Sequence, residues 1–369
     1  MKISIIMAVY NAESTIEQAL ESVIKQSHKD TELIIIDGGS NDGTISVIEQ
    51  YQDKIAYWSS EPDRGVYDAM NKGIQRASGD IIAFLNSDDW YEESALETVN
   101  HCFSDHSVDV VAGKVNYFIK DKLFASGMPL YEGKDIHLEM IYNHQSMFVK
   151  KELFDAVGNF NTKYKITADY EWTLKAHNMG YKFMRIDHIL TNFRLGGISS
   201  VQKYRGVYEC KYIALSNMGD CNKESMSEKI HNSYAGISDT YIWTLYNLVL
   251  EKDIDFVRSL FPIGNRYFIW GTGNVGEQCL QLFMWADIEI QGFIDTNKKN
   301  DYFHDYKVYF PDEIKGKERI CVATCLYEDE ISRQLFDLGY KKQEFVLFSE
   351  IRQRMIDHGR QCYCGEVML

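Results

Sequence analysis

Two adjacent carboxylates, Asp88 and Asp89, follow an apolar run at residues 81–85. Such a run is typical of a buried strand. Two like charges side by side repel each other, and one of them has a raised pKa unless a cation neutralises the pair. Carboxylate oxygens suit Mg²⁺ or Mn²⁺, which share their coordination with water and substrate phosphates. The pair therefore indicates a metal site that binds a diphosphate.

The same stretch also fits the start of a helix. An aspartate can cap the first turn, and the glutamates at 92 and 93 would favour the helix dipole. Capping explains one aspartate, but further acids follow the neighbouring predicted strands, at Asp37, Asp42 and Asp63. We therefore favour the metal site over the cap.

Periodicity predicts the elements that position these acids. The predicted strands lie at 3–10, 32–37, 55–60 and 80–85, and the predicted helices at 13–26, 44–52 and 65–77. Strands that are apolar throughout and alternate with helices form a mostly parallel sheet with helices on both faces, an α/β fold. Ligands bind beyond the carboxyl ends of such strands, so we expect the acids to share one rim.

The glycines after Asp37 allow two interpretations. Gly38, Gly39 and Gly43 fit a tight turn. A flat backbone beside a carboxylate also fits a nucleoside, because a base edge needs a hydrogen-bond acceptor and a close approach. The glycines alone do not decide between the two.

Length and composition restrict the class of protein. A chain of 369 residues predicts more than one domain, and a formal charge of −15 argues against a nucleic-acid partner. No apolar segment approaches the roughly 20 residues of a membrane span, and the first residues lack the pattern of a signal peptide, so we expect a cytoplasmic protein. The eight cysteines are scattered, which favours free thiols. His358, Cys362 and Cys364 lack zinc-finger spacing and are interpreted as a plain tail.

Four motifs follow one another over roughly residues 1–200. They are SIIMAVYNAESTIEQALESVIKQS, ELIIIDGGSNDGT, EPDRGVYDAMNKGIQRASGDIIAFLNSDDWY, and TADYEW followed by FRLGGIS. Together they resemble the family 2 glycosyltransferases, in the branch that builds capsule, exopolysaccharide or lipopolysaccharide glycans. The resemblance implies a glycosyltransferase A-type fold, a nucleoside-diphosphate sugar as donor, Mn²⁺ or Mg²⁺, and inversion at the anomeric carbon.

By position, the resemblance also assigns residue roles. Asp89 would be the metal ligand, Asp88 would face the ribose or donor sugar, and Asp169 would be the catalytic base. The nucleoside would be held, with Asp37 at the base, by Val9, Tyr10, Asn11, Glu13, Asp37 and Gly39. The chemistry agrees, because a departing diphosphate needs a Lewis acid and an acceptor hydroxyl needs a base. Asp169 also fits a helix N-cap.

Two positions depart from the pattern of the family. Gly38 stands where a second aspartate is common, and Ser87 stands at the first position of the metal triplet. Weaker assignments give phosphate contacts to Arg64, Lys72 and Arg76, acceptor or sugar contacts to His144 and Gln145, and sugar stacking to Trp90, Tyr91 and Trp172. Each has a structural alternative: a solvated helix stripe, a structural histidine, or core aromatics.

A second motif lies near the C-terminus. Gly271, Gly273 and Gly276 form GxGxxG between a predicted strand and helix, and Asp295 ends the next predicted strand. This context fits a nucleotide with its phosphate at the helix N-terminus and a ribose on Asp295. The motif resembles small Rossmann-like modules, and a structural or interaction role stays equally open.

The sequence thus predicts three parts: a catalytic domain at 1–200, a helical linker or subdomain at 201–262, and a Rossmann-like domain at 263–369. We expect an inverting, metal-dependent transferase that moves a sugar, from a UDP-sugar, to a lipid-linked surface glycan at the inner membrane face. The alternatives are an NAD(P)-dependent sugar-nucleotide enzyme and a non-catalytic nucleotide-sugar binding protein. A homo-oligomer is left open.

Overall fold

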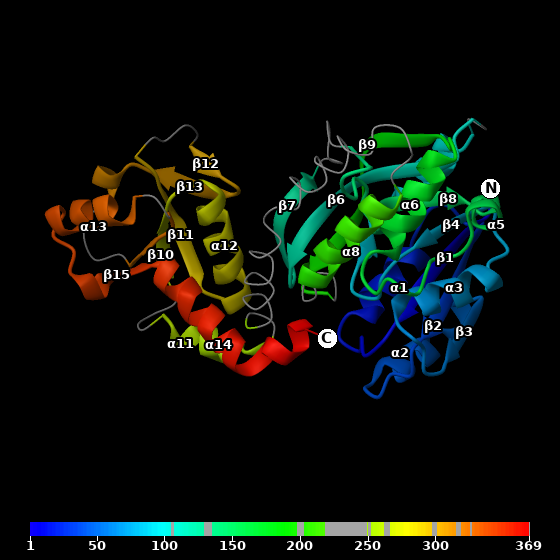
Figure 1. Ribbon diagram of the computed structural model, residues 1–369, viewed down its shortest axis with the longest axis horizontal. Helices are drawn as coiled ribbons and strands as arrows, with labels where there is room; N and C mark the ends of the chain where they lie inside the picture. The colour runs from blue at the N-terminus through cyan, green and yellow to red at the C-terminus, as the bar shows by residue number, and fades with distance from the viewer. Residues whose placement is uncertain are drawn as a thin grey trace. The chain divides into compact units, whose positions relative to one another are not determined.

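The structure is a computed structural model (Figure 1). It describes residues 1–104, 107–128, 135–197, 203–217, 249, 252–261, 266–296, 301–314, 319–324 and 327–368. The chain forms two compact units. Unit 1 comprises Met1–Phe118, Ala125–Ser199 and Arg205–Ile237, and unit 2 comprises Ile119–Phe124, Ser200–Tyr204 and Ser238–Leu369. The linker predicted at 201–262 lies mostly outside the described residues, and the three predicted boundaries stay predictions.

Unit 1 is built on one sheet with the strand order β3-β2-β1-β4-β8-β6-β9-β5, and β7 pairs with β6. The strands are β1 (Ile3–Val9), β2 (Thr31–Asp37), β3 (Tyr57–Ser60), β4 (Ile81–Phe84), β5 (Trp90–Tyr91), β6 (Val110–Ile119), β7 (Lys122–Met128), β8 (Met147–Lys150) and β9 (Phe183–Leu195). The strands β1 to β4 are parallel, which confirms the alternation predicted for the first hundred residues. The strand β8 runs antiparallel to both β4 and β6, and β5 runs antiparallel to β9.

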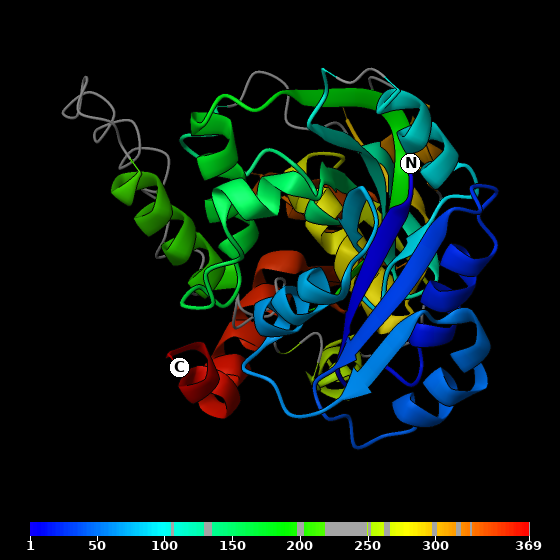
Figure 2. The ribbon, with the colours of Figure 1, turned by 90° about the vertical axis from the view of Figure 1, so that its right-hand side faces the viewer.

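The helices of unit 1 cover both faces of this sheet. They are α1 (Ile16–Ile24), α2 (Thr44–Gln50), α3 (Val66–Arg76), α4 (Ala95–Cys102), α5 (Glu152–Val157), α6 (Ala168–Asn178) and α8 (Lys203–Ser216), with short 3₁₀ turns η1 (Gln52–Lys54) and η2 (His144–Ser146). In Figure 2 the blue strands β1 and β2 stand between the blue helices α1 and α2 on one side and the light-blue α3 on the other.

Alternate side chains of β1 explain this layering. Ile3, Ile5 and Met7 pack in one core with the apolar stripes of α1 and α4. Ile6 points to the opposite face and packs in a second core with α3, α5 and α6. Successive side chains of a strand point to opposite faces, so a run that is apolar throughout needs cover on both.

Unit 2 contains a second sheet, of order β12-β13-β11-β10-β14-β15. Its elements are α11 (Ile254–Ser259), β10 (Arg266–Trp270), α12 (Asn274–Ala286), β11 (Glu289–Ile294), β12 (Tyr302–Phe303), β13 (Tyr306–Tyr309), η3 (Pro311–Glu313), β14 (Ile320–Val322), α13 (Glu328–Asp337), η4 (Lys342–Glu344), β15 (Phe345–Leu347) and α14 (Phe348–Met368). The strands β13, β11, β10, β14 and β15 are parallel, and only β12 is paired antiparallel. The segment interpreted as a plain tail is therefore the helix α14.

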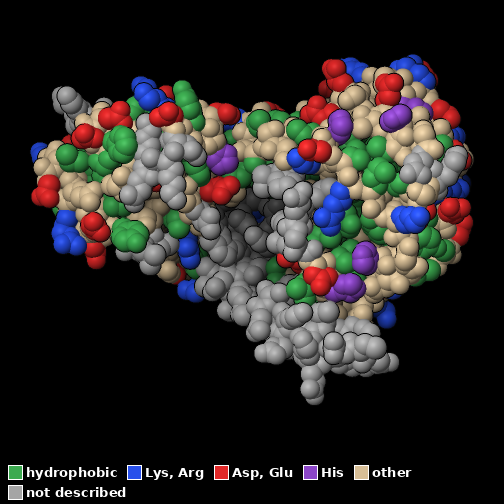
Figure 3. Space-filling model, turned by 90° about the horizontal axis from the view of Figure 1, so that it is seen from above, with side chains coloured by type: hydrophobic (Ala, Val, Ile, Leu, Met, Phe, Trp, Pro, Cys, Tyr) green, Lys and Arg blue, Asp and Glu red, His purple; other side chains and the backbone are tan. Residues whose placement is uncertain are grey.

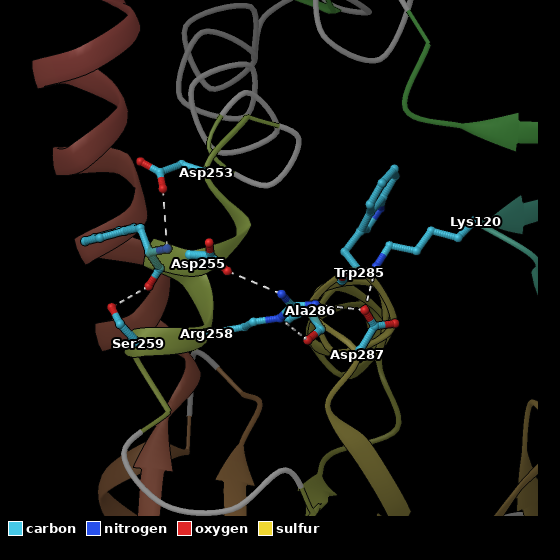
Figure 4. A network of polar contacts seen from close by, with 9 residues as sticks. Lys120, Asp253, Asp255, Arg258, Ser259, Trp285, Ala286 and Asp287 are labelled. Carbon is cyan, nitrogen blue, oxygen red and sulfur yellow. Dashed lines mark hydrogen bonds and ion pairs between the residues drawn. The ribbon is translucent and has the colours of Figure 1, made fainter. Parts of the chain in front are cut away.

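Cations of unit 2 satisfy the C-terminal end of α12 (Figure 4). Arg258 Nε donates to the carbonyl of Ala286 at 3.0 Å, and Lys120 Nζ donates to the carbonyl of Trp285 at 2.9 Å. Asp287 ends the helix with φ 56° and accepts from both cations. The hydrogen bond from Lys120 is the main cause that lowers the pKa of Asp287. Positive charge at a helix C-terminus stabilises the helix.

The surface carries charged side chains of both signs. On the face in Figure 3, acidic and basic side chains of the described residues are interspersed and form no continuous basic patch there. Within the part of the chain that the structure describes, no helix has the length and apolar character that a membrane crossing requires.

A partly buried glutamate joins the amino ends of the parallel strands. Glu32 on β2 accepts hydrogen bonds from the hydroxyl of Ser4 on β1 at 2.5 Å and from the amide of Ser78 at 2.6 Å. Lys2 Nζ lies 2.6 Å from Glu32 Oε2. Burial alone would raise the pKa of Glu32, but the hydrogen bonds from Lys2, Ser4 and Ser78 outweigh it and lower the pKa to about 2.

This arrangement predicts a pH-dependent loss of stability in Glu32→Gln. A carboxyl whose pKa is lower in the folded state stabilises the fold above its unfolded pKa, and that contribution disappears as the pH falls from about 4.5 to about 2. We expect the variant to lose about 1–2 kcal/mol of unfolding free energy at pH 7 and progressively less in acid. The measurement is chemical denaturation of both proteins from pH 7 to pH 3.

The matched control is Glu21→Gln. Glu21 pairs with Lys25 at 2.6 Å on the exposed surface of α1. Its loss should cost less than about 0.5 kcal/mol at every pH. Equal effects of the two substitutions at pH 7 would contradict the stabilising role of Glu32.

Candidate functional site

The acidic pair lies in a turn and not at a helix start. Asp88 and Asp89 follow β4 and precede β5, and the next helix, α4, begins only at Ala95 with Ser94 as its N-cap. Neither aspartate therefore caps a helix. This removes the structural alternative that the sequence left open for both.

Arg194 on β9 holds this turn. Its backbone amide donates to Asp89 Oδ1 at 2.9 Å, and its Nε donates to the carbonyl of Asp88 at 3.3 Å. The guanidinium carbon lies 5.1 Å from the ring centroid of Trp90, a cation–π contact. Asn86 donates to the other oxygen of Asp89 at 3.2 Å.

Burial gives the pair unusual electrostatics. Asp89 is 1% exposed. Burial raises the pKa of Asp88, and burial together with the neighbouring Asp88 charge raises the pKa of Asp89 well above its usual range. The charge of Arg194 opposes both shifts. A second cation at the turn would therefore favour the ionised forms.

The donor set suits a hard divalent cation only in part. Among the described residues, no cluster of three or more His, Cys, Asp or Glu side chains could hold a metal. Mg²⁺ and Mn²⁺ are commonly held by one or two carboxylates, with substrate phosphates and water completing the coordination. Asp88 and Asp89 fit that arrangement, in which the ligand itself completes the site.

The loops after β1 and β2 are joined side by side. Val9 and Asp37 are register partners at the ends of the two strands. Asn11, at φ 49°, donates its amide to the hydroxyl of Ser40, and Glu13 Oε2 accepts from the amide of Gly43 at 3.0 Å. The structure thus brings the predicted nucleoside residues to one edge, where Tyr10 is 62% exposed.

Asp37 holds its own loop. Its side chain is fully buried and accepts from the amides of Gly39 and Ser40, both at 2.9 Å, and from the hydroxyls of Ser40 and Ser60 at 2.5 and 2.6 Å. Three of these donors lie at Oδ2 and one at Oδ1, and no part of Asp37 reaches the surface. A direct contact from Asp37 to a base does not fit this arrangement, and we correct that expectation to a positioning role.

The glycines of this loop make room for neighbouring acids. A Cβ at Gly38 would lie 2.7 Å from a carboxylate oxygen of Asp63, and a Cβ at Gly43 would lie 2.3 Å from a carboxylate oxygen of Glu13. Gly39 has φ +86°, which favours glycine. The positive φ accounts for Gly39 without a ligand, whereas at Gly38 and Gly43 the atoms met are the ends of movable side chains.

The cations predicted to contact phosphates are paired on α3 and its preceding loop. Arg64 Nη2 lies 2.9 Å from Asp68 Oδ1, and its side chain is 78% exposed. Lys72 Nζ lies 3.1 Å from Glu61 and 3.6 Å from Asp68. Arg76 lies over the ring of Tyr57 at 4.5 Å. Of these three, Arg64 has the greatest freedom to turn toward a ligand.

Asp169 is the second residue of α6, whose N-cap position is Thr167. Asp169 is therefore not the cap that the sequence left open. The hydroxyl of Tyr67 on α3 donates to Asp169 Oδ1 at 2.8 Å. Glu209 on α8 accepts from the amides of residues 165, 166 and 167 at 2.9, 3.0 and 3.2 Å. Two helices thus fix the segment that carries Asp169.

His144 lies between β4 and Asp169. Its ring stacks on Phe84 at 5.0 Å, and its Nε2 is buried without a hydrogen-bond partner in the described part of the chain. Burial lowers the pKa of His144, and the charge of Asp169 opposes this. The adjacent Gln145 accepts from Thr191 through its carbonyl at 2.9 Å. A neutral imidazole with an unpaired nitrogen is suited to a polar ligand atom.

Trp172 corrects one expectation. Its ring is 2% exposed, stacks on Phe154 at 4.7 Å, and donates its N–H to the carbonyl of Gly158 at 2.7 Å. A buried ring has no face for a sugar, so Trp172 is a core residue. Tyr91 is likewise 3% exposed, and it packs against Phe148.

The second glycine motif has the predicted placement between β10 and α12. A Cβ at Gly276 would lie 2.0 Å from the carbonyl oxygen of Gly271, whereas a Cβ at Gly273 would meet nothing within 4 Å. Asp295 accepts a hydrogen bond from the hydroxyl of Thr272 and another from its amide, the latter at 3.3 Å. This contact ties Asp295 to the glycine turn, and its role toward a ribose stays a prediction.

Three contributors were not assigned from sequence. Arg194 stands within the FRLGGIS motif, and Tyr67 stands within the EPDRGVYDAMNKG motif, so both had a signal. Glu209 had none, because a glutamate on a predicted helix is usually solvated. Its role depends on a loop about 40 positions earlier in the chain.

Two family models match the chain. Residues 4–170 match the model described as glycosyl transferase family 2, and residues 264–346 match one described as C2185-like, N-terminal. The first match contains the acidic pair, the loops after β1 and β2, and Asp169. The second contains the glycine motif and Asp295.

Two curated relatives are similar over more than half of this chain. A PGL/p-HBAD biosynthesis glycosyltransferase of Mycobacterium bovis is 28% identical over 204 residues, which is 53% of this chain and 78% of that protein. An uncharacterized glycosyltransferase of Mycobacterium tuberculosis is 29% identical over 227 residues, which is 60% of this chain and 84% of that protein.

Solved structures share the fold. The S. aureus TarS 1-349 structure in complex with UDP has a TM-score of 0.52 and 17% identity, covering 78% of this chain and 90% of that one. The structure of the same protein in complex with UDP-GlcNAc has a TM-score of 0.51 and 19% identity, covering 70% and 81%. The sheet of unit 1 is thus of the A-type found in these transferases, as the sequence predicted.

The two glycines of the C-terminal motif give a matched test. Gly276→Ala places a methyl group against a backbone carbonyl, so we expect unit 2 to lose about 2 kcal/mol or more of stability. Gly273→Ala has open space and should leave the melting temperature nearly unchanged. Thermal unfolding measures both. Equal melting temperatures would contradict the close packing described for Gly276.

Proposed function

We propose that this glycosyltransferase, whose residues 4–170 form a glycosyl transferase family 2 domain, transfers a sugar from a nucleoside-diphosphate donor to an acceptor glycan with inversion. The observation that carries the proposal is the buried Asp88–Asp89 turn, held by Arg194 beyond the carboxyl end of β4. Ligands of parallel sheets bind at this edge.

The donor's diphosphate would lie at the acidic turn. A buried pair of carboxylates repels a diphosphate unless a cation stands between them. Asp89 would hold Mn²⁺ or Mg²⁺ with Asp88 beside it, and the metal when bound would act as Lewis acid for the departing diphosphate. Arg64, whose side chain is 78% exposed, would turn toward the phosphates.

The nucleoside would occupy the edge formed by the loops after β1 and β2. Val9, Asn11, Glu13 and Gly39 shape these loops, and Tyr10 exposes its ring there. Asp37 would act by fixing the loop. The solved relatives TarS with UDP and with UDP-GlcNAc support a UDP-sugar as the first donor to test.

Asp169 would act as the base. The acceptor hydroxyl gives its proton to the Asp169 carboxylate as its oxygen bonds to the anomeric carbon. The bond from that carbon to the diphosphate oxygen breaks, and the nucleoside diphosphate leaves with the electron pair. One such displacement inverts the anomeric configuration, and the base must come from a different segment than the metal ligands. Asp169 comes from α6, and the acidic pair follows β4.

His144 and Gln145 would meet the transferred sugar or the acceptor. The unpaired Nε2 of His144 supports this role, and its surroundings include Phe84 near the acidic turn.

We further propose a lipid-linked acceptor glycan, met at the inner membrane face, because the sequence resembles the surface-glycan branch of the family. Turnover with a glycan lipid should then exceed turnover with the free oligosaccharide.

The metal and donor assignments predict the behaviour of Asp89→Asn. UDP-GlcNAc, UDP-Glc, UDP-Gal and GDP-Man are screened by thermal shift with Mn²⁺, with Mg²⁺ and with EDTA. A donor at a hundred times its Kd stabilises the folded state by about 2.7 kcal/mol. We expect one donor to raise the melting temperature only with metal, and the variant to lose this shift. Without ligand, the variant should melt no lower than wild type, because a neutral amide carries no buried charge.

The control is Asp187→Asn, which removes an 85% exposed carboxylate from the same strand as Arg194. It should keep the donor-dependent shift. A shift that survives in EDTA, or that survives Asp89→Asn, would contradict the metal assignment.

The base assignment predicts that Asp169→Asn separates binding from turnover. We expect kcat to fall by about 10²–10⁴-fold, since a general base contributes that much, while donor affinity changes less than about 2-fold. Release of nucleoside diphosphate is measured with octyl glycosides as acceptors, and proton NMR of the product determines the anomer. Wild-type turnover by the variant, or retention of configuration, would refute this part of the mechanism.

A further inference from the structure

Tyr67 contacts the proposed base from a distant part of the chain. It lies in the first turn of α3, 102 positions before Asp169. Its hydroxyl is 2.8 Å from Asp169 Oδ1 and 2.7 Å from the carbonyl oxygen of Ile166. One phenol thus reaches both the carboxylate and the backbone just before α6.

The ring of Tyr67 has little freedom. It is 7% exposed and packs against Phe160, with ring centroids 5.5 Å apart. Phe160 in turn contacts His144 and Phe84, at 5.7 and 5.2 Å. The hydroxyl is therefore presented to Asp169 from a packed aromatic cluster that extends to the end of β4.

The backbone around Asp169 is fixed independently. Glu209 accepts the amides that precede α6, and Lys165 Nζ donates to the carbonyl of Arg64 at 3.0 Å. What these contacts leave undetermined is the rotation of the Asp169 side chain. Among the described side chains, that of Tyr67 donates a hydrogen bond to this carboxylate.

Burial and the nearby Asp169 charge keep the Tyr67 hydroxyl protonated, so it remains a hydrogen-bond donor. Burial first, and then the Asp169 charge, raise the pKa of Tyr67 well above its usual range. The phenol therefore keeps its proton at physiological pH. A fixed donor at Oδ1 leaves Oδ2 as the oxygen that can accept another proton.

We propose that Tyr67 is a positioning residue, which orients the Asp169 carboxylate so that Oδ2 faces the acceptor hydroxyl. The inference rests on the proposed function, in which Asp169 is the base. It adds that the reactive geometry is set by a hydroxyl on α3. A carboxylate held in one rotamer loses no rotational freedom when the acceptor arrives.

The test compares two tyrosine-to-phenylalanine substitutions. Tyr67→Phe keeps the ring and removes the hydroxyl. The matched control is Tyr170→Phe. Tyr170 is also buried and is adjacent to Asp169 in the sequence, but its hydroxyl donates to the carbonyl of Ile136 at 2.9 Å. Melting temperatures of both variants show whether each folds and what the lost hydrogen bond costs.

Turnover is measured with the UDP-sugar that binds and with octyl glycosides. We expect Tyr67→Phe to lower kcat by about 10-fold with the donor KM within about 2-fold, and Tyr170→Phe to leave both within about 2-fold. In the Asp169→Asn background, Tyr67→Phe should add less than about 2-fold, because the two act as one unit. Crystal structures provide a readout without activity: Asp169 should keep one rotamer in Tyr170→Phe and change it in Tyr67→Phe.

The outcomes separate two failures. If Asp169→Asn retains full turnover, the base assignment fails and this inference fails with it. If Asp169→Asn loses turnover but Tyr67→Phe does not, or if Asp169 keeps its rotamer in Tyr67→Phe, only the role of Tyr67 is overturned. A loss confined to the donor KM would also overturn it.

Discussion

Burial of two like charges in one turn is the constraint on which the site depends. Asp88 and Asp89 cannot both ionise cheaply where they lie. The described residues compensate with the Arg194 guanidinium, its backbone amide and the side-chain amide of Asn86. That compensation is incomplete, since the pKa values of both aspartates remain raised. A cation bound at the turn would lower both pKa values and favour the ionised pair. The glycine loop after β2 and the helix α6 lie around this incompletely compensated pair of carboxylates.

The parallel strands were the most predictable part of unit 1. Runs such as ISIIMAV need cover on both faces, and that requirement alone predicts strands between helices. The order of the loops at the carboxyl edge follows directly from it. The antiparallel β8 and β9 were less predictable. The strand β8 has only four residues, β9 is only partly buried, and tertiary contacts set the partners of both.

The role of a residue could be predicted where few explanations fit its sequence pattern. It was predicted poorly where many explanations fit. Adjacent aspartates after an apolar run have few explanations, whereas a tryptophan near a motif has many, and Trp172 proved to be core. Asp37 shows a subtler limit: its place at the strand end was predicted, but its hydrogen bonds to four donors depend on loop geometry. The same holds for Gly276, whose spacing suggests a phosphate and whose contacts show tight packing.

The hydrogen bonds from residues 165–167 to Glu209 limit where the chain can be cut into fragments. Glu209 lies on α8, beyond the end of the matched family region at 170 and beyond the boundary near 200 that the motifs suggested. A fragment cut near 200 would retain the residues proposed for chemistry in unit 1 and lose the carboxylate that orders the segment before Asp169, and one cut at 170 would also lose Arg194. A fragment that keeps this segment ordered would therefore extend through α8, a helix that carries none of the residues proposed for catalysis.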